Sequence, residues 1–525
     1  MGKLPDFLEE ELTPKVLQLL EVSHYQAELI QSLRDEIAAL KGNKPKPTIK
    51  PSVMDSEAGG DKDRNSVGEK RPGSAKKNKT EQLTIHETKM VKAENVPAGS
   101  VFKGYKEFVV QDMVINAHNI LYQVERWETP SGSYVEVKLP DGVKCHFGSK
   151  LVSYILYQYY QCHVTQPLLL EELREFGIEI SSGQISDILT LGHEGFHTEK
   201  AEILSTGLEI SPYINVDDTG ARHNGTNGYC THIGNELFAW FESTGSKSRI
   251  NFLELLCAGH INYVINVDAL FYMQEHKLPQ SELQIMESGL NQMFDGRESW
   301  QKHLVEIGVC QERHVRIATE GALIGSILAH GFNRELAILS DDAGQFAIFL
   351  HALCWVHAER SVNKLVPVSE SQRVELESKR KQIWDLYARL KDYKKQKDVS
   401  LAAALETRFD EIFTTPTSYL MLNQVQERLY KNKAELLLVL KRPEIPLHNN
   451  ASERDIREYV KKRKISGGTR SDPGRKCRDT FISLKKTCRK LGISFWDYIN
   501  DRIAGKCLLP QVPMLMRQSA ATSTY

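Results

Sequence analysis

Three groups of acidic residues have the types and spacing that phosphodiester chemistry requires. Asp217-Asp218 and Asp341-Asp342 each follow an apolar segment that reads as a strand. Glu453 falls on the first turn of an expected helix, among asparagines and arginines. Two-metal phosphoryl transfer needs two cations about 3.5–4 Å apart, and Mg²⁺ needs only one or two carboxylates besides water and phosphate oxygens. One acid of each strand pair, such as Asp217 or Asp341, and Glu453 would supply them.

Each of these acids also has an interpretation without catalysis. An Asp-Asp pair after a strand often forms a turn or a helix N-cap. Asn450 and Glu453 resemble a helix capping box, and Glu453 can pair with Arg457 one turn later. Successive strand residues point to opposite faces, so only one member of each pair can face a common site. The residues alone leave that choice open.

Cys354 and His357 lie three residues apart in an expected helix, 346–365, and would share one face. This is half of a zinc site. No second half is visible in the sequence, so zinc is not expected. A packed cysteine, and a histidine that hydrogen-bonds near the carboxylates or a phosphate, is the better interpretation.

A strongly basic segment, 454–490, follows Glu453. Its cations include Lys461, Lys462, Arg463, Lys464, Arg470, Arg475 and Lys476, and later Arg478, Lys485, Lys486, Arg489 and Lys490. Basic runs are usually solvated faces, but the position of this one after a candidate catalytic acid favours contact with a DNA backbone. Ser466-Gly467-Gly468-Thr469 reads as a flexible turn whose backbone amides can approach phosphate.

Composition excludes several classes of protein. The 525 residues suffice for about three or four domains, and 41% hydrophobic with 26% charged residues is ordinary for a water-soluble chain. The net charge of −1 hides local segregation of acids and bases. Nine cysteines without a CxxC pair argue against zinc ribbons and disulfide frameworks. Without a signal-peptide core or an apolar run near the roughly 20 residues of a membrane span, a cytoplasmic protein is expected, bacterial and associated with the nucleoid.

The N-terminal third divides by composition. Residues 1–41 predict a helix with Ile30, Leu33, Ile37 and Leu40 at coiled-coil spacing; this could join two copies or be a single amphipathic helix. Residues 42–99 read as a flexible basic linker. Residues 100–148 alternate like a small β-rich segment, with turns at 129–132 and 140–142.

Residues 149–205 predict a helical block with helices at 150–161, 166–176 and 183–191. The spacing is compatible with a helix-turn-helix DNA reader, in which Gln184, Ser186 and Asp187 would face the groove. Small three-helix units are also common in proteins that bind no DNA.

Residues 206–460 predict an α/β catalytic core. Strands are expected at 213–216 and 335–339, with a hairpin at 228–242 turning near Gly234-Asn235; residues 249–257 and 263–267 fit further sheet or a crossover. Long helices should follow at 346–365, 372–395, 401–413 and 420–441. This order is that of a ribonuclease-H-like core with a helical insertion, 366–445, before the last acid. Residues 461–525 form a basic C-terminal region that contacts DNA, and a tail.

Four stretches resemble one known family, the DDE transposases of the insertion-sequence-66 (TnpC-like) type. They are Val216-Asp217-Asp218-Thr219-Gly220, Ser340-Asp341-Asp342-Ala343-Gly344-Gln345-Phe346, Cys354-Trp355-Val356-His357-Ala358-Glu359-Arg360 and Asn449-Asn450-Ala451-Ser452-Glu453-Arg454-Asp455-Ile456-Arg457. The resemblance covers roughly residues 145–505.

The resemblance implies a transposase that binds the terminal inverted repeats of an insertion sequence. It would cut a strand at each end and use the freed 3′-hydroxyl to attack target DNA. Asp217, Asp341 and Glu453 would be the catalytic triad and the ligands of two Mg²⁺ (or Mn²⁺) ions. Supporting residues would be Cys354, His357, Asn450, Arg454 and Arg457. The implied partners are DNA, further copies of the chain and accessory proteins of the same element.

The sequence departs from the family in three places. Asp217-Asp218-Thr219 stands where the family often has Asp-Glu-Thr. The family's cysteine-rich zinc module is reduced to Cys145 and Cys162. Residues 260–319 are longer than the usual spacer and have no assignment.

Two other functions stay open. A catalytically inactive relative could act as an end-binding repressor, since the helical block and the basic regions suffice for binding. A ribonuclease-H-like nuclease would hydrolyse DNA without joining it. The intact acids favour the transposase.

Overall fold

The computed structural model describes residues 84–92, 97, 99–103, 105–136, 146–396 and 398–522. The expected N-terminal helix and most of the expected linker lie outside these residues. The chain divides into two compact units, of which the smaller comprises Lys46–Ile120 and Phe176–Ile178. The described residues of the smaller unit contain no helix or strand. All described helices and strands belong to the larger unit.

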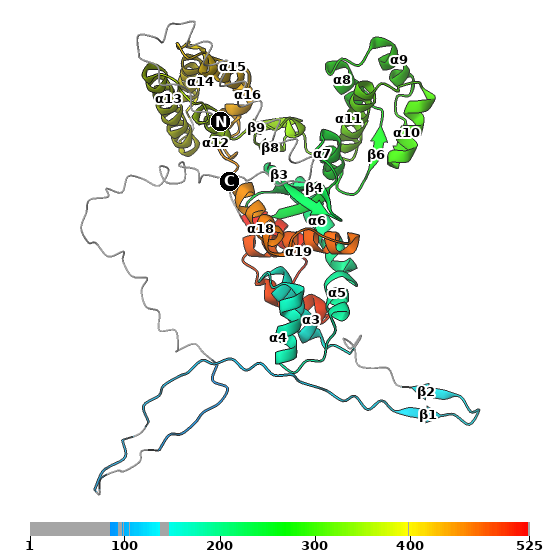
Figure 1. The fold of residues 1–525 in the computed structure, drawn as a ribbon. Helices are drawn as coiled ribbons and strands as arrows, with labels where there is room; N and C mark the ends of the chain where they lie inside the picture. Colours follow the sequence, from blue (N-terminus) through cyan, green and yellow to red (C-terminus); the bar gives the residue numbers. More distant parts are fainter. Residues whose placement is uncertain are drawn as a thin grey trace, which may run out of the picture. The chain divides into compact units, whose positions relative to one another are not determined.

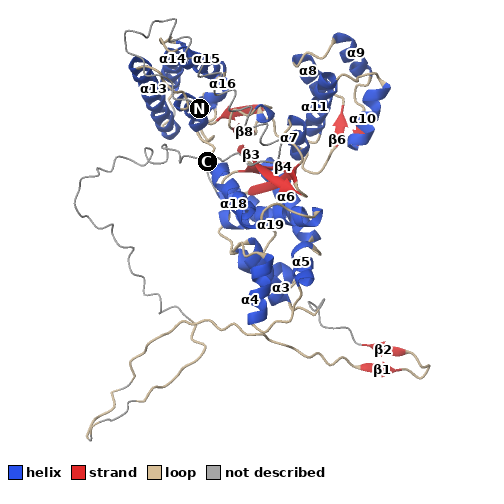
Figure 2. Ribbon diagram, in the orientation of Figure 1, coloured by secondary structure: helices blue, strands red, loops and turns tan. Residues whose placement is uncertain are grey.

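A five-stranded mixed sheet forms the centre of the larger unit (Figure 1, Figure 2). Its strands, in spatial order, are β5 (Ala239–Thr244), β4 (Thr226–Gly234), β3 (Tyr213–His223), β8 (Ala337–Ser340) and β9 (Leu350–Leu353). β3, β4 and β5 pair antiparallel, whereas β8 and β9 run parallel to β3. β8 is buried along its whole length, as a parallel strand covered on both faces must be. This mixed α/β arrangement is consistent with a ribonuclease-H-like core.

β3 is longer than the sequence predicted. The strand expected to end at Asp217 continues to His223 and turns back into β4 at Asn224-Gly225, where both residues have positive φ (47° and 78°). Such a turn matches the twist of an antiparallel hairpin. The predicted turn near Gly234-Asn235 is confirmed, between β4 and β5. The first acid pair therefore lies inside a strand and not at its end.

Two long helices, α18 (Asn450–Ser466) and α19 (Asp472–Lys490), pack on one face of the sheet (Figure 1). Phe241 of β5 packs there with Tyr459 of α18 and Ile482 of α19. On the other face, Tyr213 and Leu339 pack against residues near α17. Burial at successive helix spacings of three and four draws α19 onto the sheet along its whole length.

A first insertion lies between β5 and β8. It comprises α7 (Arg249–Leu256), β6 (Asn262–Val264), α8 (Val267–Glu275), α9 (Gln280–Ser288), β7 (Met293–Asp295), α10 (Gly296–Glu306) and α11 (Glu312–Ala329). The expectation of sheet at 249–257 is wrong, because this segment is helix α7. β6 pairs with β7 in a small separate sheet. The segment 260–319, which had no assignment, is thus most of a helical insertion.

A second insertion follows β9. The expected helix at 346–365 is replaced by a short 3₁₀ turn, η2 (Gly344–Phe346), strand β9 and helix α12 (Trp355–Asn363). Then come α13 (Glu370–Lys395), α14 (Val399–Thr414), α15 (Leu420–Lys431), α16 (Lys433–Leu436) and α17 (Leu438–Lys441). The helix expected at 420–441 is broken into three. Leu390, Phe409 and Leu422 belong to the insertion's own apolar core.

Helices flank the core on both sides in sequence. Before it lie α3 (Ser149–Tyr160), α4 (Gln166–Glu175), α5 (Ser182–Thr190) and α6 (Glu194–Ile210), and after it α20 (Phe495–Ile503) and α21 (Val512–Thr522). Phe481 of α19 stacks on Tyr160 of α3 with ring centroids 4.3 Å apart, so the helical block packs onto the core. In segment 100–148 the described strands are β1 (Arg126–Glu128) and β2 (Tyr134–Glu136), with the predicted turn between them. None of the described helices is long and apolar enough to cross a membrane.

Candidate active site

The register of two parallel strands brings the first two acids together. β3 and β8 pair from Tyr213 opposite Ala337 to Asn215 opposite Leu339. Asp217 and Asp341 each lie two residues beyond the last pair, at the same end of the sheet. Because adjacent strands are about 4.8 Å apart, the two carboxylates start from neighbouring backbone positions.

The third acid is held beside β3 by Asn449. Its side-chain Nδ2 donates to the carbonyl of Val216 at 2.8 Å, and its backbone N–H donates to Sγ of Cys354 at 3.2 Å. α18 begins at the next residue, and Glu453 lies on its first turn. The start of α18 is therefore fixed against the strand that carries Asp217.

The electrostatics of Asp217 show that the three acids converge. Burial, followed by the charge of Asp341 and then that of Glu453, raises the pKa of Asp217 to about 7 against the opposing effect of a backbone hydrogen bond. That bond is donated by the N–H of Asp218 to Oδ1 at 2.8 Å. Negative charge is thus concentrated at this end of the sheet.

The other member of each acid pair has different partners. Asp218 accepts a hydrogen bond from Oγ1 of Thr231 at 2.5 Å and from Nε2 of Gln345 at 3.0 Å. Asp342 is half exposed and accepts from Asn432 at 3.2 Å. These contacts favour Asp217 and Asp341 as the members that face a common site, as the motif alignment suggested.

Positive groups surround Glu453. Its carboxylate lies 3.6 Å from Nε2 of His357, 3.7 Å from Arg360 and 3.7 Å from Arg457. Arg360 also donates to Nε2 of His357 at 3.1 Å. Burial and then the charge of Arg360 lower the pKa of His357, so the imidazole is neutral near pH 7. Arg360 stood in the matched motif without a role; its spacing of three from His357 was the signal for this contact.

Cys354 has a structural and not a metal-binding position. It is the N-cap of α12 and not part of the helix body, and burial raises the pKa of its thiol to about 11. Its Sγ accepts the hydrogen bond from the backbone of Asn449. The role of Cys354 is therefore to join the start of α12 to the start of α18.

Within the described ranges, no three His, Cys, Asp or Glu side chains converge closely enough to cage a metal ion by themselves. The reason is visible at Glu453, whose carboxylate is drawn toward Arg360 and Arg457. Mg²⁺ commonly keeps water and phosphate oxygens as ligands, so a site completed by substrate needs fewer protein groups.

The expectation that the whole basic segment contacts DNA is wrong for half of it. Lys462 is buried, and its ammonium donates to the carbonyl of Tyr159 at 2.7 Å and lies over that ring. Lys485 pairs with Glu458 at 2.7 Å, and Asp455 pairs with two further lysines. The buried cations of this segment are Lys462, Arg478, Lys485 and Lys486. They stabilise the packing of α18 and α19 and are not available to a phosphate.

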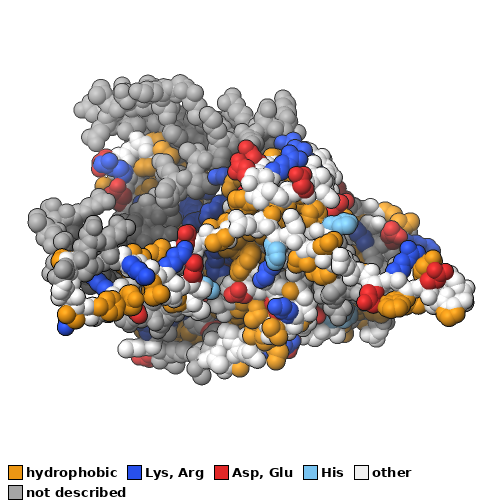
Figure 3. Space-filling model, turned by 90° about the horizontal axis from the view of Figure 1, so that it is seen from below, with side chains coloured by type: hydrophobic (Ala, Val, Ile, Leu, Met, Phe, Trp, Pro, Cys, Tyr) orange, Lys and Arg blue, Asp and Glu red, His pale blue; other side chains and the backbone are white. Residues whose placement is uncertain are grey.

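Other cations of the segment are exposed. Arg454, Arg457, Lys461 and Lys464 recur along one face of α18 and are called the α18 stripe below. Arg470 and Lys476 are also exposed, while Arg475 pairs with Asp472 at 2.9 Å and Arg463 lies close to Gly220 of β3. On the face seen in Figure 3, acidic and basic side chains are interspersed and not segregated.

The turn at Ser466–Thr469 does not offer its amides to phosphate. The N–H of Thr469 donates to the carbonyl of Arg222 at 2.9 Å, and its own carbonyl accepts from Asn224 at 2.9 Å. A Cβ at Gly468 would lie 2.4 Å from that Arg222 carbonyl, which explains the glycine. The segment therefore adds a short bridge to the end of β3, where a flexible phosphate loop was expected.

The helical block leaves its predicted contacts open. Helix α5 begins with a capping box in which the Gln184 side chain accepts from the N–H of Ser181 at 2.9 Å. Gln184 and Asp187 are exposed and Ser186 is partly exposed, but α5 contains no lysine or arginine. DNA reading by Gln184 and Ser186 stays a prediction.

Comparison with known proteins decides the family. The family model described as "Transposase IS66 family" matches residues 341–476, a segment that runs from Asp341 through His357 and Glu453. The chain belongs to the IS66 transposase family. The transposase is also 44% identical over 312 residues to "Uncharacterized protein y4jO" of Sinorhizobium fredii, covering 59% of this chain and 97% of that protein. No solved structure matches the chain.

Proposed function

We propose that this transposase cuts a DNA strand at each end of its insertion sequence and joins the freed 3′-hydroxyl to target DNA. Asp217, Asp341 and Glu453 are the proposed catalytic residues. The observation that carries the proposal is the placement of Asp217 and Asp341 at neighbouring ends of parallel strands, with Glu453 close enough to raise the pKa of Asp217. Family membership supports the same reaction.

A pair of Mg²⁺ or Mn²⁺ ions fits this group of acids. Carboxylate oxygens are the ligands these cations prefer, and the raised pKa of Asp217 marks negative charge that the protein does not neutralise. Asp217 and Asp341 would hold the ions together with Glu453. When bound, the ions would stabilise the attacking and the leaving oxygen of the phosphodiester.

The chain's own residues orient the reacting groups. Arg360 donates to Nε2 of His357, which leaves the imidazole proton on Nδ1. That Nδ1 is buried and has no hydrogen-bond partner among the described residues. We assign it to a phosphate oxygen of the DNA strand. Arg360 and Arg457 hold the carboxylate of Glu453 in place before DNA arrives.

The α18 stripe supplies a path for the DNA backbone. It starts beside Glu453 on the first turn of α18 and continues along the exposed face of the helix to Lys464. Because the stripe leads away from the acids, a duplex bound along it places one strand at the catalytic end of the sheet. Each chain has one such site and an element has two ends, so the active assembly contains more than one copy.

The test uses the full-length transposase and linear DNA carrying both ends of its own element, with Mg²⁺ or with a chelator. Asp217→Asn, Asp341→Asn and Glu453→Gln should each reduce cleavage by at least about 10²-fold, the scale expected when one charged group is lost from transition-state stabilisation. Asp342→Asn is the matched control and should cleave like the unaltered protein. DNA binding should persist in all four variants.

Three results would overturn the proposal. Full activity of the Asp217 or Asp341 variant would remove the acids from catalysis. Hydrolysed ends that never join a target would indicate a nuclease. Tight binding of the element ends without cleavage under any divalent cation would indicate a repressor.

A further inference from the structure

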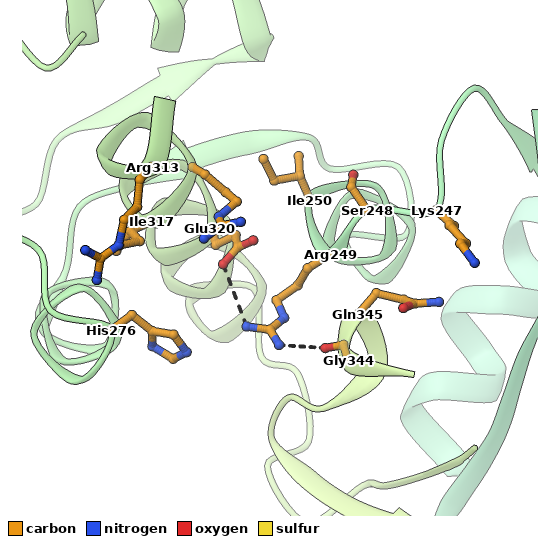
Figure 4. A pocket seen from close by; sticks show the side chains of 11 residues that line it. Lys247, Ser248, Arg249, Ile250, His276, Arg313, Ile317, Glu320, Gly344 and Gln345 are labelled. Atoms are coloured by element: carbon orange, nitrogen blue, oxygen red, sulfur yellow. Dashed lines mark hydrogen bonds and ion pairs between the residues drawn. The ribbon is translucent and has the colours of Figure 1, made fainter. Parts of the chain in front are cut away.

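A basic cleft lies next to the catalytic acids, between the first insertion and the sheet. Its volume is about 530 Å³, and it is lined by residues of α7, α11 and the turn η2 (Figure 4). Four of the lining residues are cationic, Lys247, Arg249, Arg313 and Arg316, and one, Glu320, is acidic. The family's acids and the α18 stripe take no part in this cleft.

Arg249 holds the walls of the cleft together. Its guanidinium donates to the carbonyl of Gly344 at 2.6 Å and to the hydroxyl of Tyr272 at 2.9 Å, and lies 3.8 Å from Glu320 (Figure 4). Tyr272 also donates to Glu320 at 2.6 Å. These contacts use Arg249 and neutralise the only acid in the lining. The cleft therefore keeps the charge of its other three cations.

Those three cations are available. Arg313 and Arg316 lie one turn apart near the start of α11, both are exposed, and neither has an ion pair or hydrogen bond within the described part of the chain. Lys247 is exposed just before the Ser248 cap of α7. Exposed arginines side by side on a concave surface are suited to bind a phosphate through several N–H groups at once.

Gln345 connects the cleft to the active site. It lines the cleft, and its Nε2 donates to Oδ2 of Asp218 at 3.0 Å. Asp218 is the immediate neighbour of Asp217. A strand bound at the acids thus reaches the cleft within a few atoms of its own backbone.

We propose that this cleft binds a backbone phosphate of a single DNA strand where the strand continues past the catalytic acids, with Arg313, Arg316 and Lys247 as its ligands. The inference rests on the proposed function, which brings the strand to the acids. A volume of about 530 Å³ corresponds to a space roughly 8 Å across. Since the major groove of B-DNA alone is about 12 Å wide, the cleft admits one strand and excludes a duplex.

The test compares two double variants of the full-length protein. Arg313→Ala/Arg316→Ala removes the cleft cations, and Arg297→Ala/Lys302→Ala removes two exposed cations from α10 of the same insertion. Binding of fluorescein-labelled dodecathymidylate is measured by anisotropy in EDTA across a range of KCl concentrations, beside a blunt duplex. Each phosphate contact contributes about 0.7 to the salt slope for single strands.

The cleft variant should lower the slope for dodecathymidylate by about 1.4 and the affinity at 0.1 M salt by about 25-fold, taking 1 M as the concentration where the variants converge. The α10 variant should bind like the unaltered protein, and blunt duplex should bind all three alike. Equal weakening by both variants, no weakening by either, or no binding of the oligonucleotide by the unaltered protein would overturn the inference.

The assay also separates this inference from the proposed function. If the unaltered protein shows the cleft effect but never cleaves element ends, the transposition chemistry fails and the phosphate site stands. If element ends are cleaved and joined while the cleft variant binds and cleaves normally, only the phosphate site fails.

Discussion

Replacing Asn449 with alanine should loosen the first turn of α18 and displace Glu453. Asn449 is fully buried, and its Nδ2 donates to the carbonyl of Val216 at 2.8 Å. Removing this donor from a buried carbonyl costs about 1–3 kcal/mol. That cost corresponds to hydrogen exchange about 5- to 150-fold faster in the first turns of α18, if local opening governs exchange there.

The catalytic effect should be at least as large. Since a displacement of about 1 Å can reduce a positioned reaction by about 10²-fold, cleavage of element ends by Asn449→Ala should fall by that order. Hydrogen exchange resolved on peptides of α18, together with the cleavage rate of the folded protein, measures both effects. The matched control is Asn432→Ala, whose amide bonds to the exposed Asp342 at 3.2 Å and should change neither. Normal exchange and normal cleavage in Asn449→Ala would refute the reasoning.

Three further predictions concern the basic segment and its bridge to β3. Burial lowers the pKa of Lys462 to about 7, so between pH 7 and about 10 the unfolded chain binds a proton that the folded chain does not; stability should rise by up to about 1.4 kcal/mol per pH unit, and Lys462→Met should lose this slope in urea unfolding without losing DNA affinity. Gly468→Ala, whose Cβ would lie 2.4 Å from the Arg222 carbonyl, should destabilise the protein by about 1–3 kcal/mol in thermal unfolding. Lys461→Ala/Lys464→Ala should lower the salt slope of duplex binding by about 1.8.

Each of these has a control in the same chain. Gly245→Ala, where a Cβ meets nothing within 4 Å, should leave stability unchanged. Lys381→Ala/Lys391→Ala removes two exposed cations of α13 and should leave the duplex salt slope unchanged. A Lys462→Met variant that bound DNA weakly would show that its ammonium reaches the backbone after all.

The sequence was sufficient to select the acids because their local surroundings define them. Asp341 follows a fully apolar strand, and Glu453 follows an asparagine pair at a helix start. The length of β3 could not be predicted, since Thr219, Gly220 and Ala221 are neither alternating nor strongly strand-forming. What extends this strand is its pairing with β4 and the bridge to Thr469, both of which are tertiary contacts.

The basic segment shows the limit of reading charge from composition. Lys485 and Lys462 look like surface lysines in sequence, yet each is almost fully buried. The apolar positions Cys477, Phe481 and Cys488 of α19 gave a signal, because they predict a buried helix face on which neighbouring cations must pair. Glu458 is such a partner: its pKa is held well below the usual range by a hydrogen bond from His163, and Lys485 adds to the effect.

Trp355 gives the second insertion an unusual independence. Its backbone N–H bonds to the carbonyl of Leu447 at 2.9 Å, and its indole bonds to the carbonyl of Leu436 at 2.9 Å. The excursion through α13 to α17 therefore departs and returns at one fastened point. Closing a loop costs only about 0.6 kcal/mol more for each doubling of its length, so these helices could be trimmed, or exchanged for a foreign module, while Glu453 kept its place.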